Sequence, residues 1–121
     1  MTHDDAWNHI TAAYAVAGVA EEMLRRQDEE GLDVVLYLFI GWAAAQGRQL
    51  DAAALREAEA LVHPWREEVI GPLRRLRRAM KTMGSDADAD RRERVRARVH
   101  AAELAAERAQ LDMLCDWLAL H

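Results

Sequence analysis

The feature that most constrains the fold is the run from Val34 to Ala45, which has the sequence VVLYLFIGWAAA and contains no charged residue. A helix that crosses a membrane needs about 20 apolar residues, so this run is too short for that role. Its β-branched and aromatic start would also suit a buried strand, but no second strand is available to pair with it. We therefore predict a helix, apolar on every side and enclosed by other helices, with Phe39 and Trp42 as its largest side chains.

Capping residues divide the remaining sequence into further helices. Asp4 or Asp5 suits the N-cap of a first helix, and Asp33 suits the N-cap of the apolar run. Gly31 has no Cβ and suits the left-handed position that ends a helix. Pro64 suits the first turn of a new helix, where its missing N–H costs nothing.

The predicted helices span about 5–16, 19–30, 34–46, 52–62, 64–82 and 89–120. Gly71-Pro72 should kink or briefly break the fifth helix, because Pro72 lacks the N–H that an α-helix needs. Residues 83–90 form the one predicted flexible loop, so the segments on either side should pair as a hairpin.

The length of 121 residues fits one domain. We predict a single all-α domain over residues 1–121, a compact bundle of five or six helices around a buried central helix, with a long C-terminal helix. The side chains predicted to be largely buried are Trp7, Tyr14, Phe39, Trp42, Leu73, Leu76, Val99 and Trp117.

Charge and cysteine content limit the class of protein. The formal net charge of −5 argues against a constitutive nucleic-acid-binding protein. The single cysteine, Cys115, excludes an internal disulfide framework. The N-terminal residues lack the basic and then apolar pattern of a signal peptide. These features favour a cytoplasmic protein with no membrane segment.

Three blocks of the sequence resemble an uncharacterised proteobacterial family known only as a domain of unknown function (DUF, number twenty-three-ninety). The first contains Gln27-Asp28, Gly31, Asp33-Val34 and then LYLFIGWAAAQGRQL. The others are PWREEVIGPLRRLRRAMK and AAELAAERAQLDML. The family pattern has an Asn after the Asp-Val pair, where this chain has Val35. The resemblance implies an all-α fold and no assigned activity.

Basic side chains concentrate between Arg66 and Arg98, where eleven basic and six acidic residues give a net charge of +5. A helical wheel places Arg74, Arg77, Arg78 and Lys81 away from the apolar stripe Leu73, Leu76 and Met80. They could form a solvated face that pairs with Glu67, Glu68, Glu93 or the acidic first half of the chain. Alternatively, they could bind an acidic protein or an anionic ligand. No aromatic residue is interleaved for stacking on bases, which disfavours nucleic acid.

The last helix has more apolar surface than one contact needs. One stripe runs from Val95 to Leu120, and Leu104, Leu111 and Leu118 repeat every seven residues on another side. The second stripe either packs within the molecule or meets a partner, most simply a second copy of the chain.

The motifs that carry chemistry are weak. His100, Glu103 and Glu107 share one helical face, but a metal site of this kind also needs ligands from a facing helix. Cys115 lies near the C-terminal end of its helix, which disfavours a reactive thiolate. Gln27, Asp28 and Asp33 could line a small-molecule pocket beside the apolar helix. More simply, they are cap and turn residues.

The sequence therefore predicts no catalytic residue, cofactor or metal. The leading hypothesis is a non-enzymatic protein-interaction or regulatory module, with Arg74, Arg77, Arg78, Lys81, Leu104, Leu111 and Leu118 as candidate binding residues. The alternative is a small-molecule or metal-binding helical protein, conceivably an enzyme, with its pocket beside the apolar helix.

Overall fold

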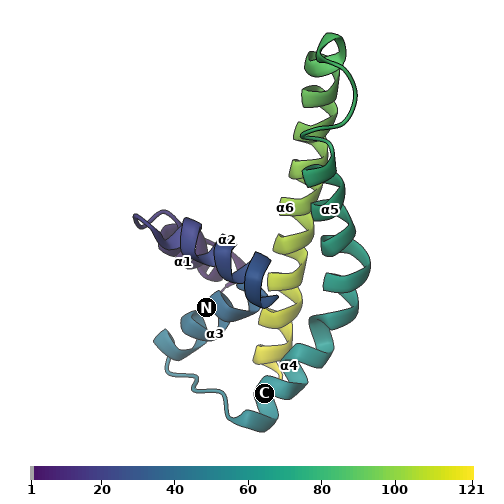
Figure 1. Ribbon diagram of the computed structural model, residues 1–121. Coiled ribbons are helices and arrows are strands. Elements are labelled where there is room, and N and C mark those ends of the chain that lie inside the picture. Colours follow the sequence, from purple (N-terminus) through teal and green to yellow (C-terminus); the bar gives the residue numbers. More distant parts are fainter. Residues whose placement is uncertain (1) are drawn as a thin grey trace. The chain divides into compact units, whose positions relative to one another are not determined.

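A computed structural model describes residues 2–121, and the regular secondary structure in this range is helical, without a strand (Figure 1). The elements are α1 (His3–Tyr14), α2 (Val19–Glu30), α3 (Val34–Ala45), α4 (Ala52–Trp65), a π-helical turn η1 (Arg66–Ile70), α5 (Gly71–Ala79), a 3-10 turn η2 (Asp86–Asp88) and α6 (Ala89–Ala119). Because α4, η1 and α5 follow one another without a gap, they form one continuous helical segment. The all-α class and the long C-terminal helix are confirmed.

The chain divides into two compact units, and the division falls within α4 and within α6. Unit 1 comprises Met1–Leu61 and Leu111–His121, and unit 2 comprises Val62–Gln110. In unit 1, α1 packs against both α2 and α3. Across residues 2–121, no helix is both long enough and apolar enough to span a bilayer.

The first helix begins earlier than the sequence indicates, because its cap is Thr2 and not Asp4 or Asp5. The Thr2 hydroxyl accepts a hydrogen bond from the Asp5 backbone N–H at 3.0 Å, and the Asp5 carboxylate accepts one from the Thr2 N–H at 3.0 Å. This reciprocal capping box satisfies two backbone donors at once. The two aspartates therefore lie in the first turn.

The predicted boundary between α2 and α3 is confirmed. Gly31 ends α2 with a φ of 67°, and its N–H bonds back to the Arg26 carbonyl. Asp33 then caps α3, since its carboxylate accepts a hydrogen bond from the Leu36 N–H at 3.1 Å. Local backbone chemistry thus fixes where the apolar helix begins.

One side of α3 provides much of the core of unit 1. Leu36, Phe39, Trp42 and Ala43 are buried, as predicted for the two aromatic residues. The opposite side is less enclosed than the sequence indicates, because Tyr37 is 43% exposed. The Arg26 guanidinium lies 5.0 Å from the centre of the Tyr37 ring, which is within cation–π distance. The guanidinium therefore covers part of this aromatic side chain.

Pro64 does not begin a new helix but lies inside α4, which corrects the predicted break after Val62. The irregularity instead falls at η1, where the Gly71 N–H bonds to the Arg66 carbonyl five residues earlier. This wider turn directly precedes Pro72 and is a known way for a helix to accommodate a lost backbone bond. A Cβ at Gly71 would lie 3.2 Å from the Arg66 carbonyl oxygen, so glycine suits this close approach.

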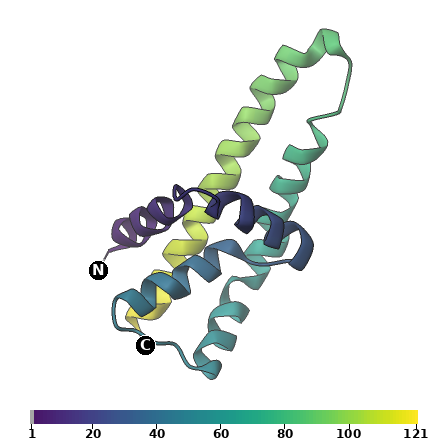
Figure 2. The same cartoon turned by 60° about the vertical axis from the view of Figure 1, so that its left-hand side comes forward.

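Unit 2 is the predicted hairpin, in which α5 and the first part of α6 run antiparallel (Figure 2). The Trp65 indole N–H donates to the Ala106 carbonyl at 2.9 Å near one end of the pair. Arg96 Nε donates to the Arg77 carbonyl at 3.2 Å further along. These two bonds fix the register of the hairpin.

The predicted core is only partly correct. Phe39, Trp42 and Trp117 are buried, whereas Leu76 is 45% exposed. The other predicted core residues, Trp7, Tyr14, Leu73 and Val99, are half-buried. The side of α5 that faces α6 contains Arg74 and Arg77, which pair with Glu103. Leu76 lies away from this contact and is therefore exposed.

Gly31 and Gly41 make a matched pair for testing the boundary of α3. Gly31→Ala places a Cβ in the left-handed region and should lower the free energy of unfolding by about 1 kcal/mol. Gly41→Ala lies inside α3 with open space around its Cβ, and should raise the free energy by up to about 1 kcal/mol. Urea unfolding followed by circular dichroism measures both, and equal effects would contradict the assigned boundary.

Candidate functional site

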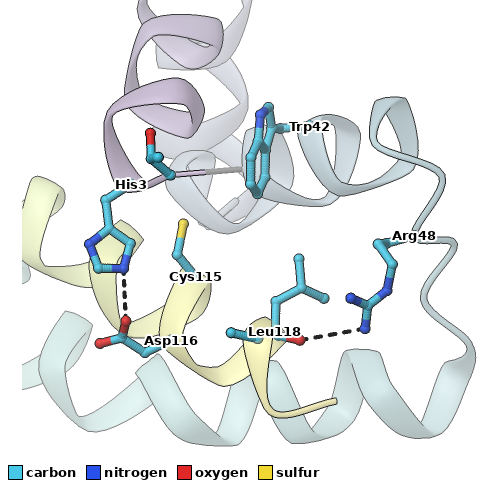
Figure 3. A pocket seen from close by; sticks show the side chains of 8 residues that line it. His3, Trp42, Arg48, Cys115, Asp116 and Leu118 are labelled. Atoms are coloured by element: carbon cyan, nitrogen blue, oxygen red, sulfur yellow. Dashed lines mark hydrogen bonds and ion pairs between the residues drawn. The ribbon is translucent and has the colours of Figure 1, made fainter.

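A pocket of about 350 Å³ lies in unit 1, beside α3. Its wall comes from three separate parts of the chain: the start of α1, the second half of α3 with the loop after it, and the last turns of α6 (Figure 3). The lining residues are Thr2, His3, Trp42, Arg48, Cys115, Asp116, Leu118 and Ala119. The volume is within the range of small-molecule sites.

An imidazole–carboxylate pair forms one end of the pocket. His3 Nε2 lies 2.7 Å from Asp116 Oδ1, where the carboxylate accepts a hydrogen bond. His3 Nδ1 lies 3.7 Å from Asp112 Oδ1. The start of α1 is therefore held against α6 by a polar contact.

A guanidinium marks the other end (Figure 3). Arg48 follows α3, and its Nη2 donates to the Leu118 carbonyl at 3.4 Å. Trp42 forms an apolar wall, and the half-buried Cys115 side chain points into the space between His3 and Trp42. The arrangement offers one cation, one imidazole–carboxylate pair and an apolar surface between them.

A second polar site, a cluster of two arginines and two glutamates, lies in unit 2 between α5 and α6. Arg77 forms a fork on Glu103, with Nε 2.5 Å from Oε1 and Nη2 3.4 Å from Oε2. Arg74 bridges two carboxylates, with Nε 3.1 Å from Glu103 Oε2 and Nη2 3.4 Å from Glu107 Oε1. The Glu103 side chain is 4% exposed and each arginine side chain is 17% exposed.

The pKa values of the two glutamates in this cluster are shifted in opposite directions. Burial alone would raise the pKa of Glu103, but the hydrogen bond and charge of Arg77, together with Arg74, bring it below its ordinary value. Burial raises the pKa of Glu107, the neighbouring charge of Glu103 raises it further, and Arg74 only partly offsets this. Glu103 is thus the ionised centre of the cluster.

The cluster corrects the predicted basic face. Arg74 and Arg77 point toward α6 and pair there, whereas Arg78 and Lys81 are exposed. The physical reason is that burying Glu103 requires cationic partners, and α5 supplies them one turn apart. The predicted solvated face is therefore wrong for Arg74 and Arg77, which pair with Glu103 and Glu107 of α6.

The weak metal candidates do not come together as ligands. His100 is exposed, while Glu103 and Glu107 face arginines, whose positive charge opposes a cation. Among residues 2–121, no group of three or more His, Cys, Asp and Glu side chains is arranged to hold a metal ion.

The second stripe of the last helix separates into two parts. Leu111 and Leu118 are buried, so these two candidates are not available on the surface. Leu104 is exposed and stays a candidate contact residue. The residues Gln27, Asp28 and Asp33 do not line the pocket, and Asp33 acts as the cap of α3.

Two sets of site residues were not predicted. Thr2, His3, Arg48 and Asp116 come from three distant segments, and no spacing in the sequence connects them. The contact of Arg74 and Arg77 with Glu103 and Glu107 could be suspected from the sequence, because the two arginines share one helical face and so do the two glutamates. The sequence does not give the register of the hairpin, which decides whether these two faces meet.

The fold and the two sites define a small all-helical protein with an ionic cluster in one unit and a pocket in the other. Residues 5–114 match the family model described as protein of unknown function (DUF2390). The chain therefore belongs to this family, and the resemblance found in the sequence is confirmed. Comparison with curated proteins and with solved structures gave no match.

The cluster predicts opposite effects from one substitution at two positions. At neutral pH, Glu103→Gln should lower the free energy of unfolding by about 3 kcal/mol, because it removes the carboxylate that both half-buried guanidinium groups share and leaves Arg74 only its 3.4 Å contact with Glu107. Glu107→Gln should raise it slightly, by less than about 1 kcal/mol, because it removes an ionised group whose pKa is already raised. Denaturant titration of both variants tests this, and equal losses would contradict the assigned roles.

Proposed function

We propose that this protein is a non-enzymatic interaction module that binds an acidic protein surface through the outer side of unit 2. The observation that carries the proposal is the charge of that unit. Residues 62–110 contain twelve Lys and Arg against eight Asp and Glu, a net charge of +4, while the remaining residues carry −9. A basic unit favours encounter with an acidic partner and disfavours basic ones.

The side chains available for binding differ from those expected from the sequence. Arg74 and Arg77 are largely covered, since each side chain is 17% exposed, so we expect binding through the basic residues that are exposed on α5, the following turn and α6. These residues are Arg75, Arg78, Lys81, Arg91, Arg94 and Arg98, of which Arg91 also donates to Asp88 at 3.1 Å.

Exposed apolar side chains accompany this charge. Leu76 of α5 is 45% exposed and Val95 of α6 is 54% exposed. The bond from Arg96 to the Arg77 carbonyl places these parts of the two helices level with each other. An acidic amphipathic helix offers the complementary combination of apolar and negative groups.

The aromatic content of unit 2 favours a protein partner over nucleic acid. Trp65 is the one aromatic residue of sequence 62–110, and its indole N–H bonds to the Ala106 carbonyl. Single-stranded nucleic acid is usually held by exposed aromatic side chains on which bases stack. The basic groups here are accompanied by leucine and valine instead.

The proposal is tested with the triple variant Arg75→Glu, Arg78→Glu, Lys81→Glu, which leaves the cluster around Glu103 intact. Immobilised protein is used to capture partners from a lysate of its native cells, and cross-linking maps the captured segment. We expect a segment with net negative charge, bound by the unmodified protein and weakened about tenfold or more by the triple variant.

A charge-conserving variant provides the control. Arg75→Lys, Arg78→Lys, Lys81→Arg keeps the three positive charges and should retain the partner, with binding that falls as salt is raised. Capture that is unchanged in the glutamate variant, or a captured segment that is not acidic, would exclude this surface. Capture of a second copy of the chain through its acidic unit would identify self-association as the function of the charge difference.

A further inference from the structure

The pocket of unit 1 is not used by the proposed protein-binding surface. Its volume of about 350 Å³ would hold a small organic molecule, and its lining comes from segments that the fold of unit 1 brings together.

The middle of the pocket is apolar. Trp42 and Leu118 are both nearly fully buried and contribute surface to the wall, together with the methyl group of Ala119. Trp42 is 3% exposed and Leu118 is 2% exposed, so a ligand would meet only a small part of each side chain. A fully polar ligand would leave this wall unused.

Arg48 is the one Lys or Arg among the lining residues. Within residues 2–121, the hydrogen bond that the structure gives its side chain is the 3.4 Å contact from Nη2 to the Leu118 carbonyl. A guanidinium has five N–H donors in a fork that matches both oxygens of a carboxylate. Most of the donor capacity of Arg48 is therefore unassigned.

The opposite end disfavours a second negative charge. The Asp116 carboxylate accepts from His3, and Asp112 lies close to the same ring. A dianion spanning the pocket would place one of its charges against these carboxylates, where like charges repel. The polarity of the pocket therefore selects a ligand with one anionic end.

We propose that this pocket binds a small organic monocarboxylate, with its carboxylate on Arg48 and its apolar body against Trp42. This assigns a ligand class to the site independently of the protein-binding surface, because unit 1 provides all of its lining residues.

The test is a titration of the ¹⁵N-labelled full chain with phenylacetate, followed by NMR of the tryptophan indole N–H groups. The chain has four tryptophans, and each gives its own signal. We expect saturable shifts of the Trp42 indole and of the Arg48 side chain, with a Kd of about 1 mM or tighter. Phenylacetamide, the uncharged analogue, should bind at least about tenfold more weakly.

Two arginine variants separate a specific role from general charge. Arg48→Met should weaken phenylacetate binding about tenfold or more, and Arg48→Lys should weaken it less. Arg56→Met removes an exposed arginine of the same unit outside the pocket and should leave binding unchanged. Circular dichroism checks that each variant is folded.

Absence of a Trp42 shift, or equal binding of phenylacetate and phenylacetamide to the unmodified chain, overturns the proposal even if Arg48→Met fails to fold. Equal binding by a folded Arg48→Met also overturns it. Shifts confined to the other three indoles would place the ligand elsewhere and have the same consequence.

Discussion

The carboxylate of Glu103 is the group on which the arrangement of unit 2 depends. Burying an ionised carboxylate costs several kcal/mol unless charged partners and hydrogen bonds replace the lost water. Arg77 and Arg74 provide these partners from α5, and their geometry requires α5 and α6 to keep one register. The same contacts determine the remaining basic surface, because two arginines are turned inward while Arg75, Arg78 and Lys81 remain exposed.

Features set by neighbouring residues could be predicted from the sequence. The left-handed end of α2 at Gly31 and the cap of α3 at Asp33 depend on residues within one helical turn, and both predictions are correct. The burial of Phe39 and Trp42 also followed from local composition, since so apolar a segment has to be covered. Pro64 was placed wrongly because a proline is compatible both with a first turn and, at a cost, with a helix interior.

Features set by distant residues could not be predicted. The helical wheel of α5 predicted that Leu73, Leu76 and Met80 form its buried side. This prediction assumed that every arginine of the helix is solvated. The carboxylates that turn Arg74 and Arg77 inward lie on another helix, and Leu76 is exposed as a result. The pocket illustrates the same limit, since His3, Arg48 and Asp116 have no common spacing and meet only through the fold of unit 1.

The most direct test of the central role of Glu103 is an NMR titration of the glutamate side-chain carboxyl carbons in the unmodified protein. We expect the pKa of Glu103 to lie below the ordinary glutamate value and that of Glu107 to lie above it. The stability that Glu103 provides should then be present above its ordinary pKa and be lost as the pH falls through its lowered value. A pKa of Glu103 at or above the ordinary glutamate value would contradict its role as the ionised centre of the hairpin. A pKa of Glu103 higher than that of Glu107 would contradict it as well.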